Sequence, residues 1–498
     1  MPKIVITEKD ETGSISLPST DHAVYIPGLM KDGSAVPPRI FSTTDSLDDA
    51  RTKEGINYDD SKLSYKLANY LLNTLGMTVV FEGLPSDKTS VPKESWTYLE
   101  NNRDRIPVRF LTTGEFKGLD QNAVNCAKHR GDCTALLCID ETKIEDGTTT
   151  SDTPYAYIPL TTEPADWDTN YTDYFEKTYI NIPEGSGTAP EFVAHTYWVK
   201  VDDIYYCLGE KPSDWDNNYT SYYYKNYINI SEGTGAPTFI INTYYKGLYY
   251  SSYDAASVRA AFDVIQEGQY AAGFTPSFYT EVSDLIVDKE SKIQEIPAPF
   301  GYLFAYARMI QTYPEWIATA GAVNGVIPEL KEPLYYYSDA DAQILQGHES
   351  GASDSPDDLD DLIEQGVAVN PILDEYPFGV VIWGARTLKL NKKAEGLKAT
   401  SFLNIRNLVS TLKKVLRKAA RRFTFSQNSD VLWYNFKSMI EPTLEEAKNG
   451  NGIEGYLIEQ LSTPAKARLK AKITIVPIEP VEDFDLEIVL TDSITVNE

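Results

Sequence analysis

The sequence Gly379-Val-Val-Ile-Trp383-Gly384-Ala-Arg-Thr-Leu388 contains the clearest fold signal in the chain. Its apolar run before Gly384 predicts a short strand, which ends where the glycine stands. An amphipathic helix is expected next, over residues 402–423, because apolar residues recur there at intervals of three and four. A second helix is expected over 430–448, where Asp430 is placed to cap its start and two glycines follow its end.

The helix over 402–423 is basic on its polar face, although the chain as a whole is acidic. The formal net charge is -28, yet residues 396–429 contain eight basic residues and no acidic one. This local reversal of charge favours a contact with an acidic surface, and the alternative is a helix face in water. Six basic residues define this basic face: Lys413, Lys414, Arg417, Lys418, Arg421 and Arg422.

Helices and strands alternate through much of the remaining sequence. Residues 60–75 predict a helix, and a strand follows at 78–81. Residues 134–140 predict a strand that is apolar through its middle, as buried parallel strands are. The pattern predicts an α/β (α+β) multidomain protein with an α/β middle domain and a C-terminal domain of sheet plus two long helices. Further elements expected are strands at 109–112, 471–476 and 484–490 and helices at 121–129, 255–267 and 298–313.

Residues 151–250 form an inserted segment that repeats itself. Pro164-Ala-Asp-Trp-Asp-Thr-Asn-Tyr171 returns as Pro212-Ser-Asp-Trp-Asp-Asn-Asn-Tyr219, at a period of about 48 residues. Short β-prone runs and turn residues in each copy predict two small tandem β modules. Their aromatic residues either form the core of a very small domain or bind glycans, since an aromatic face packs on a sugar ring. The candidate glycan contacts are Trp167, Tyr171, Trp215 and Tyr219.

Outside the insertion, the sequence predicts four further parts of the chain. Residues 1–20 contain two short alternating runs and are expected to form an N-terminal arm that either pairs with a neighbouring subunit or frays. Residues 21–150 and 251–368 are expected to be the two parts of one α/β domain. Residues 369–498 are expected to form the C-terminal domain with its terminal strand.

Composition and motifs argue against several classes of function. The acidic balance disfavours nucleic acid as the main partner, since phosphate binding needs a basic surface. The chain has neither a run of about 18 apolar residues nor a signal-peptide pattern, so we expect no membrane insertion and folding in a cytoplasm. It also has no phosphate-binding loop, no Gly-x-Ser-x-Gly and no His-Glu-x-x-His, so we expect neither an enzyme nor a cofactor.

Two segments resemble metal sites in composition but not in spacing. Cys126, His129, Cys133 and Cys138 lack a Cys-x-x-Cys knuckle, and Cys138 lies in an apolar run, so we expect small buried side chains rather than zinc ligands. The acidic run at 357–364 lacks the spacing and the central glycine of an EF-hand, so we expect the start of a short helix there. The sequence therefore predicts no metal site.

Several segments resemble the contractile tail sheath family of bacteriophages. The segment Trp383-Gly-Ala-Arg-Thr387 resembles the family's Trp-Gly-Ala-Arg-Thr motif. As in sheaths, a basic helix follows it, and then a helix with an aromatic start at Leu432-Trp433. The repeat at 151–250 is not part of the family's common core. Further segments that resemble the family, in family order, are 129–133, 314–325, 369–372 and 475–484.

The resemblance implies a structural subunit that polymerises as stacked, hexameric rings around a tail tube and contracts to drive the tube through the bacterial envelope. The implied partners are further copies of the chain, the tail tube protein, and baseplate and tail terminator proteins, in a virion tail assembled in the host cytoplasm. It also implies that the basic face contacts the tube or a neighbouring subunit, and that neighbours exchange terminal strands. The strand-exchange candidates are Ile4, Val5, Ile6, Phe484, Leu486, Ile488 and Leu490.

Two alternative functions fit the same sequence. The sheath of a phage-derived injection device or bacteriocin would share the fold and the mechanism. The aromatic repeat is also compatible with a glycan-binding phage decoration protein.

Overall fold

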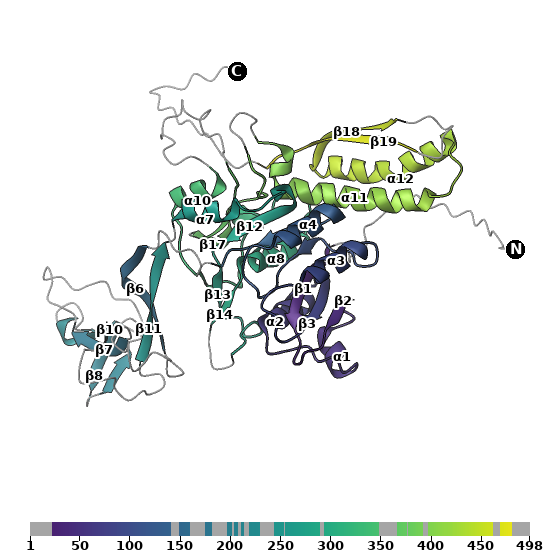
Figure 1. Ribbon diagram of the computed structural model, residues 1–498. Coiled ribbons are helices and arrows are strands. Elements are labelled where there is room, and N and C mark those ends of the chain that lie inside the picture. Colours follow the sequence, from purple (N-terminus) through teal and green to yellow (C-terminus); the bar gives the residue numbers. More distant parts are fainter. Residues whose placement is uncertain are drawn as a thin grey trace, which may run out of the picture. The chain divides into compact units, whose positions relative to one another are not determined.

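A computed structural model of the chain shows two compact units, residues 1–148 with 253–498 and residues 149–252, which are described separately (Figure 1). The limits of the smaller unit lie within two residues of the insertion expected at 151–250. Among the described residues, no helix is both long and apolar enough to cross a lipid bilayer. The described residues are 22–140, 149–159, 175–181, 197–201, 204–207, 211–213, 219–229, 244–252, 254–288, 293–347, 366–375, 377–391, 397–461 and 469–480.

An eight-stranded, mostly parallel sheet forms the centre of the larger unit, with strand order β17-β16-β12-β5-β4-β1-β3-β2. Only the edge strands β2 and β17 pair antiparallel with their neighbours. All six residues of β3 are buried, as its apolar sequence requires of a strand covered on both faces. The strands are β1 (Val24–Leu29), β2 (Val36–Phe41), β3 (Val79–Leu84), β4 (Phe110–Leu111), β5 (Thr134–Leu137), β12 (Ala271–Thr275), β16 (Asn370–Glu375) and β17 (Gly379–Ile382).

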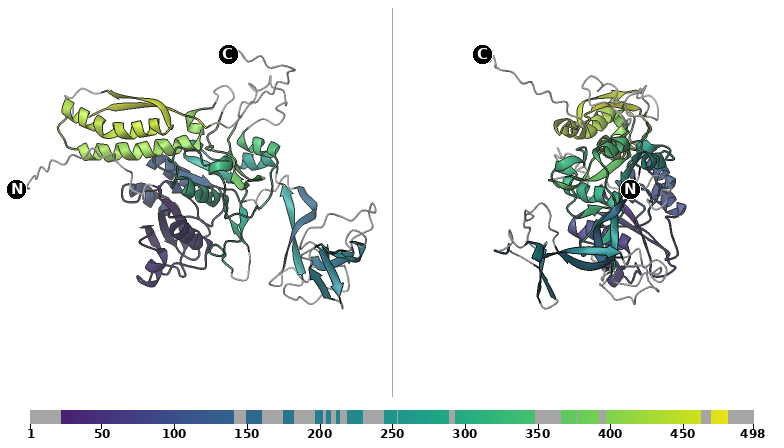
Figure 2. Two further views of the ribbon diagram at one scale, coloured as in Figure 1. Left: turned by 180° about the vertical axis from the view of Figure 1, so that it is seen from behind. Right: turned by 90° about the vertical axis from the view of Figure 1, so that its left-hand side faces the viewer.

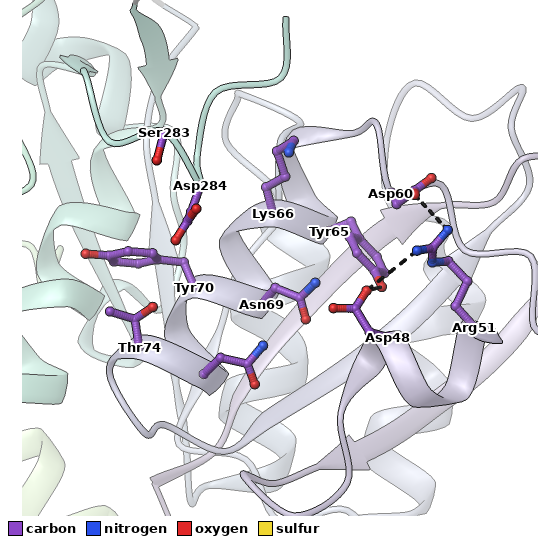
Figure 3. A pocket seen from close by; sticks show the side chains of 11 residues that line it. Asp48, Arg51, Asp60, Tyr65, Lys66, Asn69, Tyr70, Thr74, Ser283 and Asp284 are labelled. Carbon is purple, nitrogen blue, oxygen red and sulfur yellow. Dashed lines mark hydrogen bonds and ion pairs between the residues drawn. The ribbon is translucent and has the colours of Figure 1, made fainter. Parts of the chain in front are cut away.

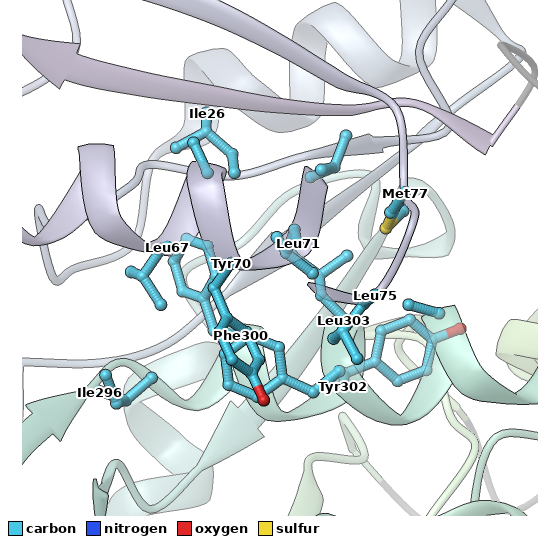
Figure 4. Packing of buried hydrophobic residues seen from close by; sticks show 14 of the residues in the cluster. Ile26, Leu67, Tyr70, Leu71, Leu75, Met77, Ile296, Phe300, Tyr302 and Leu303 are labelled. Carbon is cyan, nitrogen blue, oxygen red and sulfur yellow. The ribbon is translucent and has the colours of Figure 1, made fainter. Parts of the chain in front are cut away.

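Helices on the two faces of this sheet enclose two hydrophobic cores. Val24 and Ile26 of β1 belong to one core and Tyr25 to the other, because successive side chains of a strand point to opposite faces. In the first core, Tyr70 and Leu71 lie on the side that faces Phe300 and Leu303 of α8 (Figure 4). The helices of the first core are α2 (Leu63–Asn69), its π-helical continuation η2 (Tyr70–Thr74) and α8 (Ala298–Met309); those of the second are α3 (Lys93–Asn101), α4 (Gln121–Arg130), α7 (Ala255–Phe262) and α10 (Asp339–Gln346).

The cysteines of this unit are buried side chains, as the sequence predicts. Cys126 and Cys133 lie in the second core, whereas Cys138 lies in the first core, on the other face of the sheet. Burial raises the pKa of Cys133 to about 11. His129 is exposed, and its Nδ1 lies 3.2 Å from Glu100 Oε1. No group of three or more histidine, cysteine or acidic residues in the described part of the chain is placed to hold a metal ion.

Within the larger unit, residues 403–477 form two long helices covered by a two-stranded antiparallel sheet, which Figures 1 and 2 show from three sides. Residues 370–382, which were expected to belong to a C-terminal domain, instead form strands β16 and β17 of the central sheet. Both expected helices are present, but Ser429 rather than Asp430 caps the second, since its side chain accepts from Leu432 N. The strand at 453–460 was not expected from the sequence. The elements are α11 (Leu403–Phe423), α12 (Asp430–Asn449), β18 (Ile453–Gln460) and β19 (Ala471–Pro477).

The remaining elements of the larger unit are short. A three-stranded sheet has the order β14-β13-β15. The elements are α1 (Leu47–Thr52), β13 (Phe278–Thr280), β14 (Gln294–Ile296), β15 (Glu332–Pro333) and α9 (Gly321–Asn324).

The smaller unit is a single six-stranded antiparallel sheet, with order β6-β11-β7-β10-β8-β9. β7 (Phe175–Asn181) and β10 (Tyr223–Asn229) occupy equivalent positions in the two copies of the repeat, and they pair in the centre with Thr178 opposite Asn226. The other strands are β6 (Thr149–Pro159), β8 (Tyr197–Val201), β9 (Ile204–Cys207) and β11 (Tyr244–Ser252).

This single sheet differs from the two tandem modules that the repeat predicts. β7 of the first copy pairs with β11 of the second, and β10 of the second pairs with β8 of the first. The two contacts are equivalent, since Phe175 opposite Tyr245 corresponds to Tyr223 opposite Trp198. The sheet therefore has an internal two-fold relation, and each copy completes the other because two strands alone are marginally stable.

Candidate functional site

A buried polar network fixes α11 to the central sheet. Arg109, directly before β4, is fully buried and donates from Nη1 to the Asn407 carbonyl oxygen at 2.8 Å. Its Nη2 donates to Thr411 Oγ1 at 2.5 Å and lies 3.7 Å from Glu315 Oε1. Thr411 in turn donates to Glu315 Oε1 at 2.5 Å. Although burial opposes it, Arg109 and Thr411 hold the pKa of Glu315 below its usual value.

A second group of contacts lies farther along α11. Arg417 donates to Asp132 Oδ2 at 3.0 Å and to the Arg130 carbonyl oxygen at 3.2 Å. The Asp132 side chain is only 4% exposed, and its other oxygen lies 3.2 Å from Arg130 Nε. Arg421 forms an ion pair with Asp104. Part of the basic face therefore contacts acidic groups of the same chain, beside α4.

The other members of the basic face differ in exposure. Lys414 is buried and Lys413 is half-buried. Burial lowers the pKa of Lys413, and the positive charges of Arg406 and Arg417 act in the same direction. Lys418 and Arg422 are exposed. An outside partner could therefore reach the C-terminal end of the basic face more readily than its middle.

The segment Trp383–Thr387 ties the edge of the sheet to the start of α11, and Asn370 holds it. Asn370 is fully buried; its Nδ2 donates to the carbonyl oxygens of Gly273 and Arg386, both at 2.9 Å. Its Oδ1 accepts from Arg386 N at 2.7 Å. One side-chain amide thus joins β12, β16 and this segment. The lack of a side chain at Gly384 matters, since a Cβ there would lie 3.0 Å from Asn370 Oδ1.

The residues after Gly384 continue this connection to α11. The guanidinium of Arg386 lies 4.4 Å from the ring centre of Phe402, the residue that directly precedes α11. Thr387 donates to the Thr400 carbonyl oxygen at 2.9 Å, and Trp383 is 40% exposed. The Trp-Gly-Ala-Arg-Thr segment therefore sets where α11 begins relative to the sheet.

β18 and β19 form a sheet whose outer edges have no partner strand among the described residues. Unpaired N–H and C=O groups along such an edge can accept a further strand. Apolar side chains such as Ile473 and Ile475 pack the sheet against the helices, while Leu457 and Val476 are 55% and 50% exposed. The sheet is therefore attached on one face and open at its edges.

No protein-family model matches this sequence, and no curated protein does. Several solved structures match along nearly the whole chain, and two of them are described here. The sheath complex of the extracellular contractile injection system PVC, in its contracted state, matches with a TM-score of 0.51 and 12% identity, over 99% of this chain and 98% of that one. A chain of the contracted anti-feeding prophage baseplate matches with a TM-score of 0.52 and 14% identity, over 98% of both. The chain has the fold of contractile sheath proteins.

Within this sheath fold, the sequence missed the residues that hold α11. Arg109 was assigned only to a strand, Glu315 received no role, and Asn370 was noted only as part of the family resemblance. A usable signal was present at Arg109, because it stands between the apolar residues Val108 and Phe110 at the start of an expected strand. A charged residue in such a place needs a partner.

Apart from the basic face, most of the site residues that the sequence predicts lie outside the described residues. Tyr219, a candidate glycan contact, begins a short 3-10 helix, Tyr219–Ser221, in the smaller unit. Of the predicted sites, the residues of the basic face are therefore the ones that the described structure places together. The candidates outside the described residues are Ile4, Val5, Ile6, Trp167, Tyr171, Trp215, Phe484, Leu486, Ile488 and Leu490.

Proposed function

We propose that this chain is a structural subunit of a contractile sheath, which polymerises around a tube and contracts to drive the tube through a bacterial envelope. The observation that carries the proposal is the sheath fold, which extends over nearly the whole chain. In this role the chain acts by assembly and rearrangement rather than by catalysis. Its partners are further copies of itself in stacked, hexameric rings, the tube protein, and baseplate and tail terminator proteins.

The open edges of the β18–β19 sheet support assembly by strand exchange. With no further strand paired to it among the described residues, each edge offers backbone groups to a strand from another subunit, and such pairing gives affinity through main-chain hydrogen bonds. The strands that we propose to exchange are the arm at 1–20 and the terminal strand at 484–491. These shared strands keep neighbouring subunits connected while the subunits move during contraction.

The basic face of α11 supports a second, weaker contact. Lys418 and Arg422 are exposed near the C-terminal end of α11, so we propose that they provide the contact to the tube or to a neighbouring subunit. Exposed ion pairs contribute roughly 0–1 kcal/mol each and are screened by salt. A contact of this kind, repeated in every ring, holds an extended sheath and still releases it.

Electron microscopy of the purified protein tests the proposal directly. The full chain is expected to form sheath-like tubes, and a variant lacking residues 1–15 is expected to remain a folded monomer. A Lys9→Ala/Asp10→Ala variant, which keeps the apolar alternation of the arm, serves as the matched control and should polymerise. Normal tubes from the truncated chain would contradict strand exchange through the arm, and a full chain that never polymerises would contradict the function.

Of the two structures described above, one is the sheath complex of an extracellular contractile injection system and the other belongs to the contracted anti-feeding prophage baseplate, which favours an injection device over a phage tail as the setting. In a phage, the sheath would belong to a virion tail assembled in the host cytoplasm. Genes for a capsid and a terminase beside this one would support the phage, and their absence from the gene cluster would support the device. A glycan-binding role of the repeat is tested separately, by a glycan array with the full chain and with a variant lacking 149–252.

A further inference from the structure

A polar pocket of about 390 Å³ opens beside η2 in the larger unit (Figure 3). Its volume falls in the range of about 300–1,000 Å³ that small-molecule sites occupy. Figure 3 shows Asn69 between the group of Asp48, Arg51 and Asp60 on one side and Asp284 on the other. The pocket belongs neither to the basic face nor to the β18–β19 sheet, so the proposed function assigns it no role.

One wall of the pocket is a helical turn that departs from α geometry. Leu75 N donates to the carbonyl oxygen of Tyr70, five residues earlier, at 3.2 Å, so the turn contains one extra residue. Such π turns are rare and occur frequently at functional sites. The turn contributes the polar residues Asn73 and Thr74 to the pocket wall, while Leu71 remains in the core. The π turn therefore forms part of the pocket wall.

Two buried polar atoms at the pocket have no hydrogen-bond partner among the residues that the structure describes. They are Arg51 Nε, which is a donor, and Asn69 Oδ1, which is an acceptor. Buried polar groups are nearly always paired, and each exception needs an explanation. A ligand that offers both an acceptor and a donor would satisfy the two atoms together.

Charge around the pocket is nearly balanced, which limits the kind of ligand. Arg51 lies 2.7 Å from Asp60 Oδ2 and 3.8 Å from Asp48 Oδ1, so its positive charge is already compensated. Lys66 and Asp284 add one charge of each sign. A strongly charged ligand of either sign would therefore meet a group that repels it. A neutral ligand with several hydroxyl groups meets donors and acceptors on every side.

We propose that this pocket binds a small neutral saccharide, whose hydroxyl groups pair with Arg51 Nε, Asn69 Oδ1 and the polar side chains of η2. Each hydroxyl donates once and accepts twice, which matches a wall that mixes donors and acceptors. This site is distinct from the aromatic residues of the insertion. It provides the larger unit with a recognition site of its own.

Binding of neutral mono- and disaccharides to the full chain tests the proposal, with glucose, galactose, mannose, N-acetylglucosamine and their disaccharides as probes. Titration calorimetry and saturation-transfer NMR should show saturable binding of at least one of them, and inorganic phosphate should not compete. Asn69→Leu and Asn73→Ala should each weaken that binding by about tenfold, since each removes hydrogen bonds to the ligand. Asn101→Ala, at an exposed asparagine of α3, is the matched control and should leave binding unchanged.

Several results would overturn the proposal. If no saccharide binds to the folded full chain, the pocket contains nothing but water and the proposal is wrong. The site lies elsewhere if binding is unchanged in both pocket variants, or if it is lost when 149–252 are removed and the larger unit stays folded. If the Asn69→Leu variant stays folded but no longer polymerises, and no saccharide binds the parent chain, the pocket belongs to an interface between subunits. Circular dichroism of each variant separates these results from loss of folding.

Discussion

Replacing Arg109 by methionine should loosen α11 from the central sheet. The change removes a fully buried guanidinium and leaves Glu315, whose side chain is 10% exposed, without that charge beside it. Breaking a buried ion pair by removing one partner typically destabilises a protein by about 3–5 kcal/mol. Arg109 Nε has no hydrogen-bond partner in the described part of the chain, so the network seen there is not fully satisfied. We therefore expect the unfolding free energy to fall by about 3 kcal/mol, near the lower end of this range.

The loss should depend on pH through Glu315. Arg109 and Thr411 hold its pKa below the usual 4.5 against burial, so its stabilising contribution is present above pH 4.5 and is lost as pH falls through the lower native value. Without Arg109 the effect of burial dominates and the pKa of Glu315 rises. The variant is then destabilised most at neutral pH, where the buried carboxylate is charged. The difference in unfolding free energy between the variant and the parent chain should become smaller as pH falls from 7 toward 5.

Urea unfolding gives the size of this effect, and hydrogen exchange gives its location. The amides of α11 should exchange faster in Arg109→Met than in the parent chain. A double variant, Arg109→Met/Glu315→Gln, should recover part of the stability because it removes the uncompensated charge. Arg105→Met, at an exposed arginine, should change the stability by less than about 0.5 kcal/mol. Unchanged α11 exchange, or a difference that is the same at pH 5 and pH 7, would refute the reasoning.

Three further changes test other parts of the structure. Asn370→Ala should lower the unfolding free energy in urea by about 2–4 kcal/mol, because one buried amide loses three hydrogen bonds. Removing 212–252 should make the rest of the insertion sensitive to limited proteolysis, because β7 loses both neighbours; a resistant fragment would contradict the shared sheet. Lys418→Glu/Arg422→Glu should impair assembly on tubes seen by electron microscopy and should lower the urea midpoint less than Arg417→Glu, which breaks the pair with the buried Asp132. Unchanged assembly would make the exposed basic end a solvated face.

The sequence predicted the helices of this chain better than its strands. α11 and α12 were expected within one residue of their limits, because their apolar spacing is regular and local. β18 was missed because its sequence, Ile453-Glu-Gly-Tyr-Leu-Ile-Glu-Gln460, starts among glycines that predict a turn. Its pairing with β19, in which Gln460 lies opposite Ala471, was therefore missed as well. The order of the eight-stranded sheet was beyond prediction because it joins strands far apart in the sequence, such as β12 and β5.

The repeat shows a related limit of sequence analysis. Similar strands in the two copies indicated duplication correctly, but they did not indicate which strands pair. A strand of one copy can pair with its own copy or with the other, since the sequences that would form the contacts are nearly the same. The structure shows pairing between copies, as with Thr178 and Asn226. Duplicated sequence therefore does not imply duplicated modules.

The basic face shows how a charge pattern can combine two roles. Eight basic residues without an acidic one suggested a single surface for a partner. Asp132 and Asp104, remote in sequence, instead pair with Arg417 and Arg421 and hold α11 to the α/β part of its own subunit. Arg421 is exposed like Arg422, so only its position beside Asp104 gives it a partner within the chain, whereas Arg417 is partly buried against Asp132.

On the proposed function, this division of roles gives α11 a mechanical part in the sheath. Force from a neighbouring subunit enters through strands that pair with β18 and β19. It passes to α11 and α12 through the apolar contacts of that sheet, such as those of Ile473. It then reaches the central sheet through Arg109 and Asp132, which lie where α11 meets the α/β part. Buried charged contacts suit this position, because a partner left alone in the core is strongly unfavourable and the helix is therefore held in one place.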